Sequence, residues 1–304
     1  MLDLDATLHA FTHAVAGVVT ERDVVEAVGP DAASFLQGQL SQEIENLAVG
    51  ASVPALLLQP QGKVDAWLRV SRLEPERFWL DVDAGYGAAV AERLNRFKIR
   101  VKVELTLLER QPVLTVRGPG ADGGPSAVGL DPGDAVVLAV PAEQARGAGP
   151  GFDLVGAVPD DGPVPLGPPA AREAWRIRWG LPAMGRELDE STIPAAAGIV
   201  EESVNFTKGC YVGQELVARI DSRGASTPTR LRGLRLAEPL DLTGGEVVEA
   251  DGADVGRVTS YAPVTGEGPL ALAYCRRALD VPAPVVVVDA AGHRVAAEAV
   301  ELPF

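Results

Sequence analysis

Cysteine, histidine and lysine are all scarce in this 304-residue chain. Its two cysteines, Cys210 and Cys275, cannot by themselves supply the four ligands that an iron–sulfur cluster or a structural zinc ion usually takes from a protein. His9 and His13 have the spacing of neighbours on one helical face, but no third ligand completes a metal site around them. We therefore expect no permanently bound metal.

Long apolar runs are also missing, and none approaches the length that spans a membrane. The first residues, Met-Leu-Asp-Leu-Asp, lack the basic and apolar regions of a signal peptide, so we expect a cytoplasmic protein. Positive charge is in deficit, with a formal net charge of −15. Because binding to nucleic acid depends on lysine and arginine neutralising phosphates, this argues against a direct nucleic-acid partner.

The first third of the chain alternates strand patterns with helical patterns. Asp31 follows a Gly-Pro turn and is placed to cap the helix that begins at Ala32. The predicted elements are a strand at 24–28, a helix at 32–39, a hairpin of 55–58 with 63–70, a strand at 78–83, a helix at 86–97 and a strand at 101–107. This order indicates helices packed on an antiparallel sheet.

The middle of the chain is rich in glycine and proline but still carries apolar strands, predicted at 113–117, 135–140 and 152–156. Residues 118–123 have the glycine spacing of a dinucleotide-binding loop, yet no helical pattern follows them, so we reject that interpretation. A helix over 169–181 is predicted to end with Gly180, a residue type that suits the position after a helix.

The last quarter of the chain changes to short strands joined by turns. They are predicted at 231–236, 246–250, 255–260, 270–275, 284–289 and 294–302, with no helix between them. Six short strands of this kind indicate a small antiparallel barrel. We therefore expect an α+β fold in three domains, with boundaries at 1–110, 111–225 and 226–304.

The segment from Val204 to Ile220 gathers the most chemistry. Its start alternates like a strand end, and from Val212 its apolar residues recur every four positions, as on a helix. Lys208 and Cys210 stand between the two patterns, and Lys208 is one of only four lysines in the chain. The alternative is a tight connection that merely holds a half-buried thiol, since free cysteine is often a small core residue.

The eight residues Lys-Gly-Cys-Tyr-Val-Gly-Gln-Glu at 208–215 resemble the signature of the YgfZ family. These are folate-binding proteins related to the T-protein, or aminomethyltransferase, of the glycine cleavage system, and they are associated with assembly or repair of iron–sulfur clusters and, through such enzymes, with tRNA modification. Two weaker resemblances to the T-protein superfamily flank the signature, one at 28–40 and one at 254–274. Together they cover most of the chain.

The resemblance implies a T-protein-like arrangement of two ferredoxin-like α+β units and a C-terminal antiparallel β-barrel around a central folate channel. It implies that Lys208 and Cys210 face that channel as catalytic residues, with Cys210 a nucleophile or transient metal ligand. Tyr211, Gln214 and Glu215 are then expected to bind the cofactor, tetrahydrofolate or a one-carbon derivative. Their alternative role is to shape the turn through hydrogen bonds.

Two positions depart from the transferase pattern. The aspartate that acts as general acid or base in aminomethyltransferases corresponds here to Val90, which cannot move a proton; Asp81 and Asp83 are the nearest carboxylates. The glutamate that anchors the pterin ring corresponds to Arg178, which has no acceptor atom. Arg178 is then expected either to meet the anionic glutamate tail of a folate or to be an exposed helix charge.

Three functions remain open on the sequence. The first is a YgfZ-like folate-binding protein whose partners are iron–sulfur client or assembly proteins, including tRNA-modifying enzymes. The second is a tetrahydrofolate-dependent aminomethyltransferase or demethylase, against which Val90 and Arg178 both argue. The third is a non-catalytic interaction protein on the same fold. The sequence leaves undecided whether the protein is an enzyme.

Overall fold

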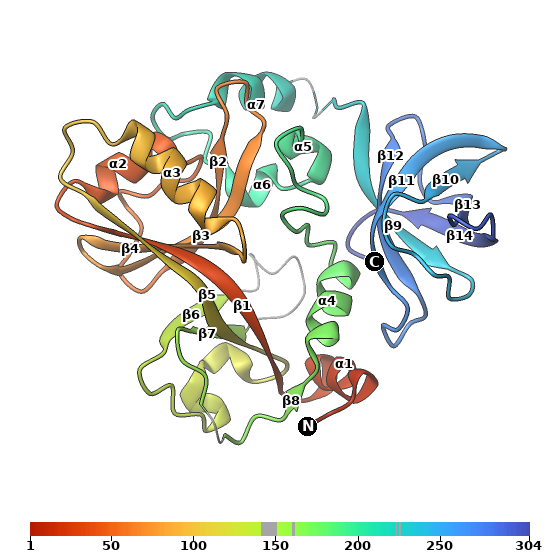
Figure 1. Cartoon of the computed structure of the whole chain (residues 1–304), viewed down its shortest axis with the longest axis horizontal. Coiled ribbons are helices and arrows are strands. Elements are labelled where there is room, and N and C mark those ends of the chain that lie inside the picture. The colour runs from red at the N-terminus through yellow and green to blue at the C-terminus, as the bar shows by residue number, and fades with distance from the viewer. Residues whose placement is uncertain (141–150, 160–161, 223, 225) are drawn as a thin grey trace.

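A computed structural model describes residues 1–140, 151–159, 162–222, 224 and 226–304. It consists of a long curved sheet that carries helices and, on the opposite side, a closed barrel (Figure 1). The strand order in the sheet is β2-β3-β4-β1-β5-β7-β6, with β8 parallel to β1. The strands are β1 Ala16–Val28, β2 Ser52–Leu58, β3 Val64–Glu74, β4 Arg77–Asp83, β5 Glu104–Arg117, β6 Val136–Val140, β7 Gly151–Val155 and β8 Leu166–Gly167.

Seven α-helices are found among the described residues: α1 Leu4–His13, α2 Ala32–Gln39, α3 Gly87–Phe97, α4 Pro169–Arg178, α5 Pro194–Ala197, α6 Val200–Ser203 and α7 Gln214–Asp221. Helices α2 and α3 pack on the β1–β4–β5 part of the sheet, and α4 lies between the sheet and the barrel (Figure 1). The predicted end of α4 is confirmed, because Gly180 has φ 64° in the position after the C-cap.

The barrel closes in the order β10-β11-β12-β9-β14-β13. Its six strands are those predicted from the sequence, β9 Thr229–Leu236, β10 Val247–Ala250, β11 Ala253–Ala262, β12 Leu270–Arg276, β13 Ala283–Val288 and β14 Arg294–Val300. Cys275 is buried in the barrel core, as expected of a packing residue. The predicted fold class, α+β units with a C-terminal antiparallel barrel, is confirmed.

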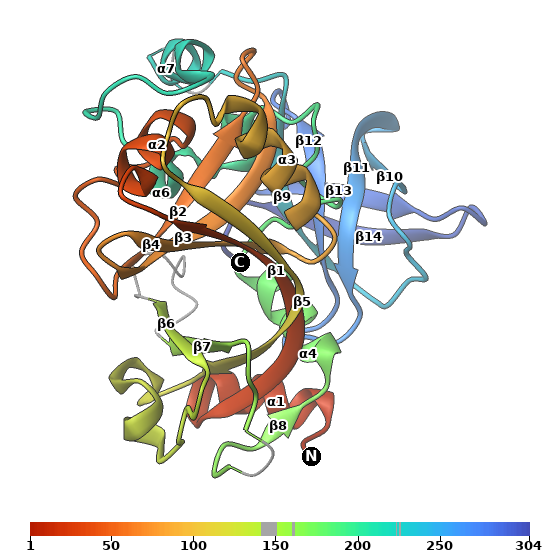
Figure 2. The ribbon, with the colours of Figure 1, turned by 60° about the vertical axis from the view of Figure 1, so that its left-hand side comes forward.

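The two longest strands, β1 and β5, run side by side through both halves of the sheet and bend together (Figure 2). The pairing of β1 with β5 shifts between Arg22 and Val24, and Arg110 on β5 has φ 46°. The Asp23 carboxylate holds the bend, because it accepts hydrogen bonds from the backbone N–H groups of Gly85, Gly87 and Arg110 at 2.8–2.9 Å. Residue 110, the expected end of the first domain, lies at this bend.

Three local expectations are wrong. Residues 204–206 are not a strand, because Val204 caps α6 and the Asn205 side chain accepts the N–H groups of Thr207 and Lys208, which forms a turn. The Asp31 side chain does not cap α2; it accepts the N–H of Lys102 instead. The two strands expected at 101–107 and 113–117 are the single strand β5.

The rejected dinucleotide loop itself contains a 3₁₀ turn, Ala121–Gly123, and is followed by a second, Pro125–Val128, and not by an α-helix. Helix α1 brings His9 and His13 together as stacked rings 4.3 Å apart. No group of three or more metal-ligating side chains occurs among the described residues. Within the same residues, no helix has the length and apolar character needed to cross a membrane.

Asp23→Asn is expected to lower the free energy of unfolding by about 3 kcal/mol, since buried N–H donors would lose a charged acceptor. Burial alone would raise the pKa of the Asp23 carboxyl, but the backbone donors outweigh it and hold the pKa below its usual value. The stabilisation is therefore complete above the unfolded-state pKa of about 3.9 and is lost as the pH falls through the lowered folded pKa.

Urea denaturation followed by circular dichroism at several pH values measures this effect. The matched control is Asp134→Asn, at an exposed loop position. Equal stability of the D23N and D134N variants at pH 7 would contradict the role of Asp23.

Candidate functional site

The signature segment is fastened to the first half of the sheet through Lys208. Its ammonium group donates hydrogen bonds to the carbonyl oxygens of Gln37, Leu40 and Gln42, each at 2.7 Å, at the C-terminal end of α2. Burial lowers the pKa of Lys208 to about 8, while Glu43 and Glu45 act in the opposite direction. At pH 7 the group is therefore mostly protonated, and it can donate all three hydrogen bonds, one to a carbonyl that the last turn of α2 leaves free and two to carbonyls at and beyond its C-cap.

The end of the signature is fastened to the β2–β3 hairpin. Gly213 has φ 84°, and a Cβ atom there would lie 2.5 Å from the carbonyl oxygen of Gln59, so no other residue fits. Gln214 accepts the backbone N–H of Tyr211 through its side chain, and burial raises the pKa of Tyr211 to about 12. Tyr211 and Gln214 thus shape the turn, whereas the Glu215 side chain is exposed.

Cys210 is exposed between these two attachments. It lies before α7, outside the helix, and the Lys208 ammonium is directed to α2. The segment therefore presents the thiol to solvent on a short loop whose two ends are held.

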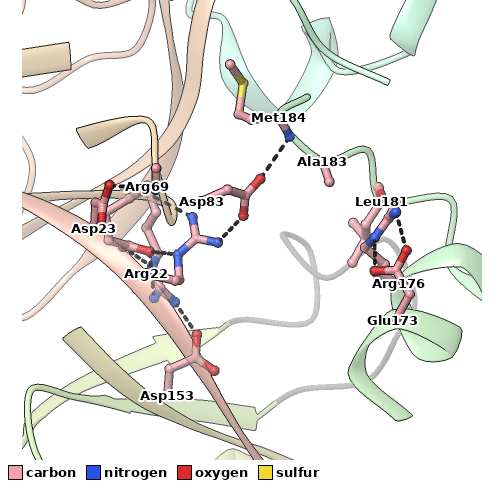
Figure 3. Close-up of polar contacts among 12 residues, drawn as sticks. Arg22, Asp23, Arg69, Asp83, Asp153, Glu173, Arg176, Leu181, Ala183 and Met184 are labelled. Carbon is pink, nitrogen blue, oxygen red and sulfur yellow. Dashed lines mark hydrogen bonds and ion pairs between the residues drawn. The ribbon is translucent and has the colours of Figure 1, made fainter. Parts of the chain in front are cut away.

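A cavity of about 300 Å³ lies at the centre of the chain, between the sheet and α4. Strands β1, β3, β4, β5 and β7 supply one wall, and α4 with residues 181–183 supplies the other. Figure 3 shows charged side chains from both walls that face one another across this space. None of Lys208, Cys210, Tyr211, Gln214 and Glu215 is among the lining residues.

The sheet wall carries a chain of ion pairs. Asp81 is bound by both Arg22 and Arg69, at 2.5 Å and 2.7 Å. Arg69 also binds Asp153, at 2.7 Å, and Asp153 binds Arg117 at 3.0 Å. Burial opposes ionisation of Asp153, but the two arginines hold the pKa of its carboxyl far below the usual range.

The two walls are joined by Asp83. One of its carboxylate oxygens binds Arg22 at 2.7 Å, and the other accepts the backbone N–H of Met184 at 2.9 Å (Figure 3). Asp83 is about one-third exposed, which leaves it open to a ligand. Its neighbour on the same face, Asp81, is buried, so the alternation of β4 directs both carboxylates toward the cavity.

Helix α4 adds charge from the other side. Arg176 is buried and binds Glu173 and Glu187, at 2.5 Å and 3.1 Å. Glu187 in turn accepts the hydroxyl groups of Thr259 and Ser260 in the barrel. This network sets the position of α4 between the cavity and the barrel.

Arg178 lies outside the cavity. Its guanidinium binds Glu267 in the loop between β11 and β12 at 2.5 Å, and its side chain is one-quarter exposed. Val90 also lies outside: it is 2% exposed on the face of α3 that packs into the core. Val90 and Arg178, the two positions expected to depart from the transferase pattern, therefore both lie outside the cavity.

A larger cavity, of about 820 Å³, lies beyond Pro54, which lines both spaces. Residues 195–198, three alanines and a glycine, form part of its wall against the barrel. It brings together fewer charged groups than the central cavity, and its Arg232 is already bound to Glu301 at 2.6 Å. The central cavity is therefore the better candidate for a ligand site.

Sequence reasoning did not identify Arg22, Arg69, Arg117 or Asp153 as cavity residues. They lie on four different strands, and only the pairing of those strands brings them together. The charged residues within the predicted strands were a partial signal of such a cavity, because a charge inside a strand must find a partner or face a cavity.

Comparisons with known proteins agree with this architecture. Residues 229–304 match the family described as the glycine cleavage T-protein C-terminal barrel domain. An aminomethyltransferase of Symbiobacterium thermophilum is 30% identical over a 316-residue alignment, which covers 92% of this chain and 83% of the relative. A mitochondrial iron–sulfur cluster assembly factor, the IBA57 homolog of Pyricularia oryzae, is 29% identical over 288 residues, covering 84% of this chain and 70% of the relative.

The fold is also that of a solved structure, the glycine cleavage system aminomethyltransferase T from Bartonella henselae. The TM-score is 0.80 over 99% of this chain and 89% of that chain, at 21% sequence identity. The chain belongs to the aminomethyltransferase family, the family of the glycine cleavage T-protein.

Lys208→Met is expected to lower the free energy of local opening of residues 205–213 by about 2 kcal/mol, because three carbonyls would lose a charged donor. Amide hydrogen exchange over these residues should therefore become faster. Exchange measured by mass spectrometry tests this, with Lys102→Met, at an exposed position, as the control. Unchanged exchange in the K208M variant would show that Lys208 does not hold the segment.

Proposed function

We propose that this protein is a YgfZ-like, folate-binding member of the family that supports assembly or repair of iron–sulfur clusters in client enzymes, including tRNA-modifying ones, in the cytoplasm. The observation that carries the proposal is the exposed thiol of Cys210 on a loop held at both ends. The similarity to a protein named as an iron–sulfur cluster assembly factor supports it.

Cys210 acts in this proposal as a nucleophile or as a transient ligand. One thiolate cannot hold a cluster, since cysteine-ligated clusters typically have four protein ligands. The remaining ligands would come from the client or assembly protein that docks on this face. An exposed thiol suits such a transfer, because both partners must reach the same iron or sulfur atom.

The central cavity has the residue types that a folate needs. Trp67 and Leu181 offer apolar surfaces for flat rings, and Asp83 offers a partly exposed carboxylate for the N–H groups of a pterin. Tetrahydrofolate or a one-carbon derivative, held there, would supply a one-carbon carrier. Because Arg178 binds Glu267, we assign the pterin contact to Asp83 and none of the ligand to Arg178.

The transferase alternative is favoured by the relative named an aminomethyltransferase. In its usual form it requires a proton carrier at the position of Val90, and that position is buried and apolar here. Transfer chemistry would therefore need a different acid or base. A non-catalytic interaction protein remains the third candidate, and it predicts that no folate binds.

Cys210→Ala is expected to abolish complementation in a strain that lacks the protein, measured as the activity of iron–sulfur enzymes. The thiol is exposed, so its removal leaves the core intact and should not change the melting temperature. The matched control is Cys275→Ala, in which a buried thiol is removed: it should lower stability yet retain activity in the folded fraction. Full activity of the C210A variant would rule out a role for the thiol.

Anaerobic calorimetric titration with tetrahydrofolate and 5-formyl-tetrahydrofolate tests the cofactor. Saturable binding at micromolar affinity, about −8 kcal/mol, is expected for wild type. Asp83→Ala should weaken it at least tenfold. Absence of any binding by wild type would leave the interaction protein as the best interpretation.

A further inference from the structure

One end of the central cavity carries two arginines against one aromatic ring. Arg117 from β5 and Arg172 from α4 both line the cavity, and their guanidinium carbons lie 5.3 Å and 5.1 Å from the centre of the Trp175 ring. Arg117 is 3% exposed. Its two terminal nitrogens are engaged, but its Nε donor has no partner in the part of the chain that the structure describes.

The carboxylates near these arginines already form ion pairs. Asp153 is shared by Arg69 and Arg117, and Asp81 is shared by Arg22 and Arg69. No ion pair joins Arg172 to a carboxylate among the described residues. The carboxylates on the α4 side of the cavity, Glu173 and Glu187, both bind Arg176. Around this end of the cavity, positive charge therefore exceeds the negative charge that is free to neutralise it.

The lowered pKa of Arg172 agrees with this local excess of positive charge. Burial, and then the charges of Arg117 and Arg22, lower its pKa to about 10, although Asp153 and Asp83 act in the opposite direction. A cation without a counter-ion calls for an anionic ligand, and Arg117, whose unpartnered Nε is buried, contributes its charge to this end of the cavity.

We propose that Arg172 and Arg117 form an oxyanion-binding site at the Trp175 end of the central cavity. The fork of guanidinium donors suits a carboxylate or a phosphate, which accepts two parallel hydrogen bonds. The ligand has two possible sources: the carboxylates of a folate's glutamate tail, or a free oxyanion such as inorganic phosphate. The first rests on the proposed function, and it orients the folate with its tail toward Arg172 and its pterin toward Asp83.

Calorimetry on the full chain separates these sources. The ligands are tetrahydrofolate, 4-aminobenzoylglutamate, which has the tail without the pterin, 6-methyltetrahydropterin, which has the ring without a carboxylate, and inorganic phosphate. Arg172→Gln should weaken tetrahydrofolate and 4-aminobenzoylglutamate at least tenfold and leave 6-methyltetrahydropterin unchanged. Arg96→Gln, which removes an exposed arginine from α3, is the charge-matched control and should bind all ligands as wild type does.

Failure of this site and failure of the proposed function give different results. If wild type binds phosphate but no folate, and R172Q loses the phosphate, the oxyanion site stands and the folate proposal fails. If wild type binds none of the three anions, or R172Q binds them as wild type does, the oxyanion site is wrong. Should R172Q not fold by circular dichroism, R172K, which keeps the charge but not the fork, should weaken the anions at least threefold, and unchanged binding would overturn the site.

Discussion

Strands β1 and β5 bend together where their pairing shifts between Arg22 and Val24, and this bend places one wall of the central cavity. Asp23 fixes it by binding three backbone N–H groups from β5 and from the start of α3. Arg22, the preceding residue, is thereby directed into the cavity, where it binds Asp81 and Asp83 (Figure 3). The side-chain carboxylate of Asp23 therefore determines where the charged wall of the cavity lies.

The signature segment and the central cavity are separate features of this chain. Lys208 is engaged with the carbonyls of α2 and Gly213 with the hairpin, so the most recognisable residues of the segment hold a loop in place. Cys210, by contrast, is exposed and available to another molecule. We assign ligand recognition instead to residues of the sheet and α4, whose charges are buried and therefore strongly interacting.

The two residues expected at transferase positions lie apart from the charges of the central cavity. Val90, the residue expected at the position of the transferase acid or base, is a core residue of α3, and a valine cannot carry a proton. Arg178, the residue expected at the position of the pterin-anchoring glutamate, binds Glu267 in the loop between β11 and β12. What remains at the centre is a set of ion pairs that is suited to holding an anionic ligand in a fixed orientation.

Local patterns in the sequence were enough to predict the α+β units, the six barrel strands and the helices at 32–39, 86–97 and 169–181, the last of which ends at Arg178 in the structure, because periodicity and glycine positions are local properties. They misplaced Val204 as strand, although it caps the short helix α6 through Val200, and they misplaced Asp31 as a helix cap, because its hydrogen-bond partner Lys102 lies elsewhere in the fold. The cavity could not be predicted in this way, because Arg22, Arg69, Arg117 and Asp153 are distant along the chain and meet only when their strands pair. The engagement of Lys208 has the same cause: its three carbonyl partners lie at and just beyond the end of α2, more than 160 residues away in the sequence, and meet it only in the tertiary structure.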